Sequence, residues 1–273
     1  MILCGIVLYN PDIKRLVDCV NSVINQVDKI IFVDNGSATI NDVKNAFERK
    51  TQIEFICNSA NLGIAFALNQ IISFGRKNNY DWVLTLDQDS ICSEHMVENM
   101  VLASNAVDSV GIMCPLTVDV DNYCNDNSSN STREMEWCIT SGSLINLKNT
   151  EKCSFDNKMF IDLVDYDFSI QVKQAGLKII RVYNSILYHR LGDLVVKKFL
   201  WFNVEVTNHN AMRRYYYVRN VYYILKKYNF DAKTVRFWKK KIRDLYFKVF
   251  FFENDKLNKI KMMRKGKNDS KSM

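Results

Sequence analysis

The chain has 273 residues, 48% of them hydrophobic and 25% charged, which suits one large domain or a domain with an appendage. This composition excludes global disorder, and the scarcity of glycine and proline (9 and 2 residues) argues against a fibrous or loop-rich protein. The charge is uneven: residues 1–189 carry a net charge of −8 and residues 190–273 a net charge of +15, which indicates different roles for the two parts.

The eight cysteines are spread along the chain without a CxxC pair. We interpret them as reduced cysteines of a cytosolic protein, and we expect no zinc site. The first stretch, MILCGIVLYNPD, has no basic leader, so its apolar part is predicted to be a strand and not a signal peptide. No apolar run approaches the roughly 20 residues that a membrane-spanning helix needs.

The first part of the chain alternates between two patterns. Compact apolar runs predict strands at 2–9, 29–34, 53–58 and 82–87. Apolar residues at helical spacing predict helices at 12–26, 40–49, 61–77 and 94–106. This alternation predicts an α/β fold with a largely parallel central sheet.

Polar side chains follow each of these four strands: Asn10, then Asp34 and Asn35, then residues 58–61, then Asp87-Gln88-Asp89. Ligands bind at the carboxyl ends of the strands in such sheets. The two aspartates of WVLTLDQDS could belong to an ordinary turn or could hold a divalent cation. Four polar strand exits along one predicted edge favour the cation.

The rest of the chain is less regular. Residues 119–134 are polar and predict a mobile loop that could act as a lid, and residues 136–148 are strand-like. Residues 159–180 combine an acidic entry with a helix and a strand. We expect a catalytic domain at 1–193, a basic aromatic helical extension at 194–261 with helices at 213–228 and 236–252, and a disordered tail at 262–273.

Five motifs occur in a characteristic order: VDNGS (33–37), NLGIAFALNQ (61–70), LTLDQDS (84–90), FIDLVDYDFSIQVKQAGLKI (160–179) and YHRLGD (188–193). The set resembles the family 2 glycosyltransferases, which are inverting enzymes of the GT-A fold. It is most similar to bacterial rhamnosyltransferases of O-antigen, capsule or cell-wall polysaccharide assembly. The resemblance implies a nucleotide-sugar donor (dTDP-rhamnose, or a UDP-sugar as the alternative), Mg²⁺ or Mn²⁺, and a lipid-linked saccharide acceptor.

The resemblance also implies roles for single residues on the donor side. Asp89 would ligate the metal, Asp87 would hold the ribose or the metal's water shell, and His189 would ligate the metal or touch the diphosphate. The nucleotide would be bound by Tyr9, Asn10, Asp34, Asn35, Asn61, Gly63 and Gln88. Five of these residues also have a structural alternative: a turn or cap for Asp34, Asn61 and Gly63, a core position for Tyr9, and a structural role for His189.

Asp165 is the expected general base, because it matches the second residue of the family's acidic pair. Val164 replaces the first residue of that pair, and Asp162 could partly replace the missing carboxylate. A single displacement needs one base and no protein nucleophile. The alternative for Asp165 is helix capping. The resemblance places Trp137, Gly142, Asp162 and Arg190 on the acceptor side.

The basic C-terminal part interleaves lysines and arginines with aromatic residues. This pattern predicts peripheral attachment to the anionic inner face of a bacterial membrane, from the cytoplasm. The alternatives are helices packed on the catalytic domain and, with no supporting motif, nucleic-acid binding. The first strand is not followed by GxGxxG, which argues against an oxidoreductase. A non-catalytic, membrane-associated carbohydrate-binding protein is the remaining rival.

Overall fold

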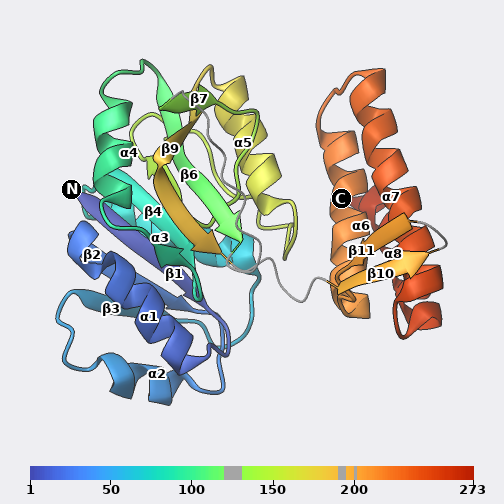
Figure 1. Cartoon of the computed structure of the whole chain (residues 1–273), viewed down its shortest axis with the longest axis horizontal. Helices are drawn as coiled ribbons and strands as arrows, with labels where there is room; N and C mark the ends of the chain where they lie inside the picture. Colours follow the sequence, from blue (N-terminus) through green and yellow to red (C-terminus); the bar gives the residue numbers. More distant parts are fainter. Residues whose placement is uncertain (120–130, 190–194, 200–201) are drawn as a thin grey trace. The chain divides into compact units, whose positions relative to one another are not determined.

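The computed structural model describes residues 1–119, 131–189, 195–199 and 202–273. Its contacts divide the chain into two compact units (Figure 1). The N-terminal unit consists of Met1–Asn157 and Val164–Arg190, and the C-terminal unit of Lys158–Leu163 and Leu191–Met273. Most of the predicted lid loop (120–130) and Arg190 lie outside the described residues.

Nine strands of the described chain form one sheet, in the order β3-β2-β1-β4-β8-β6-β9-β5, with β7 paired to β9. Six strands run in one direction, since β1, β2, β3 and β4 are mutually parallel and β6 and β9 follow the same direction across the antiparallel β8. The predicted α/β class with a mostly parallel sheet is therefore confirmed. The strands are β1 Ile2–Leu8, β2 Lys29–Asp34, β3 Ile53–Cys57, β4 Trp82–Asp87, β5 Ile91–Cys92, β6 Val110–Asp119, β7 Thr132–Glu134, β8 Ser143–Asn146 and β9 Lys178–His189.

Helices cover both faces of this sheet (Figure 1). Leu16 and Val20 of α1 pack in one core cluster with Ile6 of β1. On the other face α3 approaches so closely that a Cβ added at Gly5 would lie 2.2 Å from the Ile71 side chain. The helices of the N-terminal unit are α1 Ile13–Val23, α2 Ile40–Phe47, α3 Ile64–Lys77, α4 Met96–Ser104 and α5 Val164–Gln174.

The described part of the C-terminal unit contains a hairpin and three main helices. Asn210 and Asp231 accept hydrogen bonds from the backbone N–H three residues ahead, which fixes where the first two helices begin. A small apolar core joins the helices, formed by Val218, Val221, Ile242, Val249 and Met263. The elements are β10 Val195–Phe199, β11 Phe202–Val206, α6 Ala211–Lys227, α7 Ala232–Phe252, α8 Lys256–Asp269 and a short 3-10 helix Ser270–Ser272. No helix in the described ranges is long and apolar enough to cross a membrane.

The disordered tail expected at 262–273 is wrong, because α8 packs closely against α6. A Cβ added at Gly266 would lie 2.4 Å from the backbone oxygen of Tyr215, so only glycine allows this approach. Met263 is fully buried, and the buried Lys259 ammonium lies 3.0 Å from Glu253. The end of the chain therefore belongs to a helix whose buried side, at Lys259, Met263 and Gly266, packs into the C-terminal unit.

The segment Lys158–Leu163 belongs to the C-terminal unit although it precedes α5 in the chain. The fully buried Asn220 donates from its side-chain amide to the carbonyl oxygens of Ile161 (2.8 Å) and Asp162 (2.9 Å). Phe160 stacks on Tyr216 with ring centroids 4.8 Å apart. These contacts explain why the division differs from the expected single boundary after residue 193.

Candidate active site

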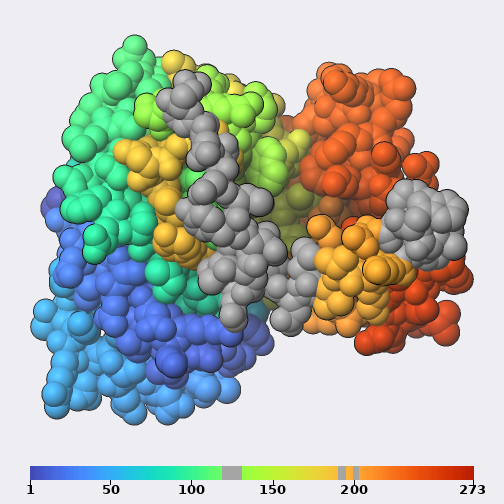
Figure 2. Space-filling view, in the orientation of Figure 1, coloured from blue at the N-terminus to red at the C-terminus, as the bar shows by residue number. Residues whose placement is uncertain are grey.

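The strand register brings the predicted polar exits to one edge of the sheet. Leu8 pairs with Asp34, Val7 pairs with Asp87, and Asp34 pairs with Cys57. The carboxyl ends of β1, β2, β3 and β4 are therefore level with one another. The segments that follow them form a continuous polar rim, as the sequence predicts. In Figure 2 the blue surface of the N-terminal segments adjoins the green surface of the segments that follow.

Hydrogen bonds tie the loop after β2 to the loop before α3. The Asn35 side-chain amide donates to Asn61 Oδ1 (2.9 Å), and Asn35 Oδ1 accepts from the Leu62 N–H (3.0 Å). Asp34 is 2% exposed, and its carboxylate accepts from the backbone N–H of Ser37 (3.1 Å). Asp34 and Asn35 therefore shape this turn, and a carboxylate still has capacity to accept from a bound base.

The loop after β1 is tied to its two neighbours. The Tyr9 N–H donates to Gln88 Oε1 (3.0 Å), and the Asn10 N–H donates to Ser37 Oγ (2.8 Å). Tyr9 is 50% exposed, so it is not a core residue and its ring lies at the rim. Gly63 ends the rim with φ = 90°, a backbone conformation that favours glycine directly before α3.

An aspartate–histidine pair lies where β4 and β9 end. The His189 Nε2 atom lies 3.9 Å from Asp87 Oδ2, and its Nδ1 atom lies 3.0 Å from Ser90 Oγ. Ser90 is fully buried, and its hydroxyl contacts Ser141 Oγ (2.8 Å), which accepts from the Asp87 N–H (3.0 Å). This chain of hydroxyl groups orients the imidazole so that Nε2 faces the carboxylate. The sequence analysis missed both serines, and only the position of Ser90 next to Asp89 could have suggested one.

These residues can be tested as a metal site. Within the described residues, no group of three or more His, Cys, Asp or Glu side chains is arranged to hold a metal ion, so Asp89 does not complete a three-ligand set with Asp87 and His189. The pair still fits Mg²⁺ or Mn²⁺, because such ions are commonly held by one or two protein ligands together with substrate phosphates and water. A second group that orients the histidine is also typical of metal sites.

Asp165 lies in the first turn of α5, half-buried, and its Oδ1 accepts from the Tyr166 N–H (2.8 Å). It lines a small cavity of about 10 Å³ together with Thr85 of β4 and Thr140. The Thr85 hydroxyl donates to the Thr140 carbonyl oxygen (2.5 Å). The strand that leads to Asp87 and the helix that carries Asp165 therefore border the same space.

The expected acceptor residues belong to different units: Trp137 and Gly142 to the N-terminal unit and Asp162 to the C-terminal unit. Trp137 is 47% exposed, and its ring contacts the ring of Tyr166 edge-on. Tyr166 follows Asp165 in α5, so Trp137 packs against the first turn of that helix. Gly142 has φ = 84°, and a Cβ there would lie 2.7 Å from the Pro115 side chain, so packing alone explains this glycine. Asp162 belongs to the C-terminal unit, where Arg213 donates to its carboxylate (3.2 Å).

Two cysteines of this part of the molecule, Cys19 and Cys92, are buried. Burial raises the pKa of the Cys92 thiol to about 12 and raises that of Cys19 still further, so both stay protonated. The Cys19 thiol donates weakly to the Asp87 carbonyl oxygen (3.6 Å). All seven cysteines within the described ranges are free, as predicted.

Comparison with known proteins agrees with this geometry. The model of the family "Glycosyl transferase family 2" matches residues 4–159, more than half of the chain. The chain is 26% identical over 241 residues to the dTDP-rhamnosyl transferase RfbF of Shigella flexneri, covering 81% of this chain and 79% of that one. It is 25% identical over 134 residues to the glycosyltransferase SunS of Bacillus subtilis (strain 168), covering 48% of this chain and 30% of that one.

Solved structures share the fold at low sequence identity. GalNAc-T7 with UDP, GalNAc and Mn²⁺ superposes with a TM-score of 0.62 at 13% identity, covering 83% of this chain and 47% of that one. S. aureus TarS 1-349 superposes with a TM-score of 0.56 at 13% identity, covering 69% and 60%. The expected GT-A fold is confirmed. The chain belongs to glycosyl transferase family 2.

Proposed function

We propose that this transferase moves L-rhamnose from dTDP-rhamnose onto a lipid-linked saccharide, with inversion at the anomeric carbon, in bacterial surface polysaccharide assembly. The observation that carries the chemistry is the oriented pair of Asp87 and His189, at the end of the strand whose Thr85 borders the same small cavity as Asp165. The similarity to a dTDP-rhamnosyl transferase over most of both chains supports the donor.

The nucleotide lies along the rim formed by the first four strands. The exposed Tyr9 ring offers a face for the base, and Asp34 can accept from a ring N–H. Asn35 and Asn61 fix the loop before α3, and Gly63 leaves room for close approach of the sugar. These residues bind and orient the donor without taking part in proton transfer.

Asp87 and His189 are the residues that would hold Mg²⁺ or Mn²⁺, whereas Asp89, which was the expected ligand, forms no three-ligand group with them within the described residues. When bound, the ion neutralises the charge that develops on the departing diphosphate. Ser90 and Ser141 keep the imidazole turned toward Asp87 through their hydroxyl groups. The protein thus presents a preformed carboxylate–imidazole pair before the donor arrives.

Asp165 acts as the general base. The acceptor hydroxyl attacks the anomeric carbon from the face opposite the diphosphate, and its proton passes to the Asp165 carboxylate. The new bond joins the acceptor oxygen to the anomeric carbon, and the bond between that carbon and the phosphate oxygen breaks. The dTDP leaves with the bonding pair, and the configuration inverts in one displacement. No side chain forms a covalent intermediate, in keeping with the protonated cysteines nearby.

We also propose that the protein works at the inner membrane surface, where a lipid-linked acceptor is found. Support comes from α7, on which Phe237, Phe247, Phe250 and Phe251 are exposed among lysines. A helix with exposed aromatic and basic side chains suits the headgroup layer of an anionic membrane. Nucleic-acid binding finds no support in this arrangement.

Calorimetric titration of the purified chain with dTDP and with UDP, each with and without Mn²⁺, tests the donor. We expect tight, metal-dependent binding of dTDP and weaker binding of UDP. Preference for UDP would replace rhamnose by another sugar while keeping the mechanism, which is the second candidate function, since TarS has been solved with UDP. Binding of neither nucleotide to folded protein would favour the non-catalytic carbohydrate-binding alternative.

A further inference from the structure

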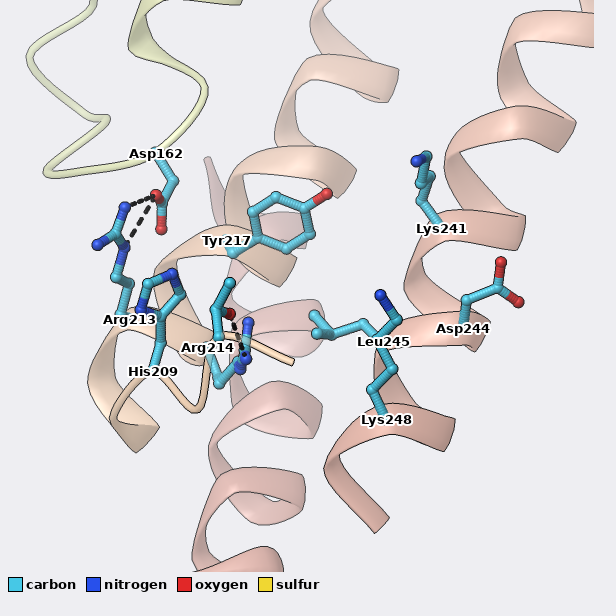
Figure 3. A pocket seen from close by; sticks show the side chains of 10 residues that line it. Asp162, His209, Arg213, Arg214, Tyr217, Lys241, Asp244, Leu245 and Lys248 are labelled. Atoms are coloured by element: carbon cyan, nitrogen blue, oxygen red, sulfur yellow. Dashed lines mark hydrogen bonds and ion pairs between the residues drawn. The ribbon is translucent and has the colours of Figure 1, made fainter. Parts of the chain in front are cut away.

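The C-terminal unit contains a pocket of about 360 Å³ that its own residues line, separate from the rim that binds the donor (Figure 3). Its walls come from α6, from α7 and from the segments around Asp162 and Thr207. In Figure 3 the phenol of Tyr217 extends from α6 toward α7. Nothing in the proposed transfer chemistry uses this space.

The pocket carries a surplus of positive charge. Four cationic side chains line it (Arg213, Arg214, Lys241 and Lys248), against two carboxylates, Asp162 and Asp244. His209 also lines it, but burial and then the two arginines lower its pKa to about 4, so it is neutral near pH 7. The surplus of two charges therefore comes from arginine and lysine alone.

The arginines form a fixed floor. Arg214 is buried, forms an ion pair with the buried Glu253, and donates to Thr207 Oγ1 (3.1 Å). Arg213 donates to the Asp162 carboxylate from two nitrogens, at 3.2 and 3.1 Å (Figure 3). Because each arginine already has a carboxylate partner, these groups shape the pocket and supply N–H donors more than free charge.

The lysines supply the charge that is available to a ligand. Lys241 and Lys248 are seven residues apart on α7, which places them two turns apart on one side of the helix. Lys241 lies over the Phe237 ring at 5.4 Å, and neither lysine forms an ion pair within the described residues. Two ammonium groups and a phenol beside a floor of N–H donors suit a multivalent oxyanion.

We propose that this pocket binds the phosphoryl group of a lipid, held by Lys241 and Lys248 above the floor of Arg213 and Arg214. The exposed Phe237, one turn before Lys241, and Phe251, one turn after Lys248, lie on the lysine side of α7 and favour a lipid over a soluble phosphate, because aromatic side chains insert at headgroup depth. The proposal rests on the proposed membrane attachment and names the chemical group that this attachment recognises. Either an anionic phospholipid or the diphosphate of a lipid-linked acceptor offers such a group.

The test is vesicle co-sedimentation of the full chain with three kinds of vesicle: phosphatidylcholine alone, phosphatidylcholine with phosphatidylglycerol, and phosphatidylcholine with a polyprenyl diphosphate. The variant is Lys241→Gln with Lys248→Gln. Its matched control is Lys239→Gln with Lys240→Gln, which removes the same charge from exposed positions of the same helix that do not line the pocket. We expect the pocket variant to bind one of the two phosphate-bearing vesicles about tenfold more weakly than the control does.

The kind of vesicle to which the pocket variant binds more weakly than the control identifies the lipid that supplies the phosphoryl group. Equal weakening in both double variants would overturn the pocket, since it would show attraction to the surface as a whole. If the parent chain binds inorganic diphosphate, measured by calorimetry, as tightly as it binds the vesicles, the proposal that the ligand is a lipid would be overturned. Titration with dTDP separates this proposal from the proposed function, because the donor rim lies in the N-terminal unit: both variants should bind dTDP like the parent chain.

Discussion

Different interactions stabilise the interior of each of the two units. The N-terminal unit buries a large continuous apolar cluster between its sheet and its helices. The described part of the C-terminal unit has a smaller apolar cluster of five buried side chains, and it also buries the charged groups of Arg214, Glu253 and Lys259. Apolar burial is insensitive to pH and salt, whereas a buried charge cluster depends on every one of its members.

This difference matters for function. The donor rim and Asp165 stand on strands and a helix whose positions are fixed by packing, so their geometry tolerates changes in the solvent. The C-terminal unit depends on its buried charged groups, and one of them, Arg214, also lines its pocket. We therefore expect changes in either unit to be separable by experiment, and the following predictions run from the largest expected effect to the smallest.

The sharpest change to the N-terminal unit is Asp165→Asn. It removes the proton acceptor while keeping size and shape, so kcat should fall about 10²- to 10⁴-fold. Release of dTDP in the presence of acceptor measures this, and calorimetry with dTDP should give an unchanged Kd. The neighbouring change Asp167→Asn is the control for a helix-capping role, since Asp167 is fully buried in the same turn. Equal losses in both variants would contradict the assignment.

The strongest change to the C-terminal unit is Glu253→Ala. It leaves Arg214 and Lys259 buried without their shared carboxylate, which should cost about 3–5 kcal/mol of stability. Thermal unfolding should then show an earlier transition for this unit, while the affinity for dTDP is kept. Glu205→Ala, at an exposed position, serves as the control. A shift of the whole unfolding curve as one transition would show that the units are not energetically separate.

A smaller effect is expected at the hydroxyl groups behind the proposed metal ligands, Asp87 and His189. Ser90→Ala frees the His189 ring from its Nδ1 partner. Metal affinity typically falls about 10- to 100-fold when such an orienting group is lost. Binding of dTDP should weaken in the presence of Mn²⁺ and stay unchanged in its absence. If both conditions weaken alike, Ser90 supports the fold and not the metal site.

The smallest effect concerns pH. The pKa of His209 is lowered from 6.5 to about 4, so the unfolded chain takes up this proton below about pH 6.5 and the folded unit does not. The stabilising contribution is complete above pH 6.5 and is lost as the pH falls toward 4. Asp162 acts in the opposite direction, because burial raises its pKa.

Replacing His209 by Asn should therefore flatten the decrease in melting temperature of the C-terminal unit between pH 6.5 and 4. The difference between the two melting temperatures should stay constant above pH 6.5 and change steadily as the pH falls from 6.5 to 4, because only the parent chain loses stability through this proton. A slope that is the same in both proteins would mean that the proton uptake occurs elsewhere.

The contrast between the units also explains what the sequence could predict. The strands predicted at 29–34 and 82–87 match β2 and β4 residue for residue. A short apolar run between polar residues is typical of a buried strand, so its ends can be predicted from the sequence. The parallel pairing of these strands brings the polar residues after β1, β2, β3 and β4 to one edge of the sheet, as expected for a parallel sheet. Ser90 and Ser141 could not be predicted, because a serine has no characteristic sequence spacing to its partners. Their partners Asp87 and His189 are brought close only by the fold.

Sequence reasoning failed where tertiary contacts override composition. The terminal position of residues 262–273 suggested disorder, yet Lys259 of the same helix is neutralised by Glu253 and Gly266 allows close contact with α6. The hairpin of β10 and β11 was not predicted either. The excursion of residues 158–163 into the C-terminal unit depends on Asn220, a single amide whose two acceptors no local pattern reveals.

That excursion has a consequence for how the protein can be dissected. The chain enters the C-terminal unit at Lys158, leaves it at Leu163 and returns later, so no single cut yields two intact fragments. A truncation after residue 190 would strip Lys158–Leu163 of the amide and the aromatic ring that hold it, just before the helix that carries Asp165. Separately expressed halves, domain swaps between relatives and limited proteolysis should all meet this obstacle. Grafting a new C-terminal unit would require replacing the inner segment with it.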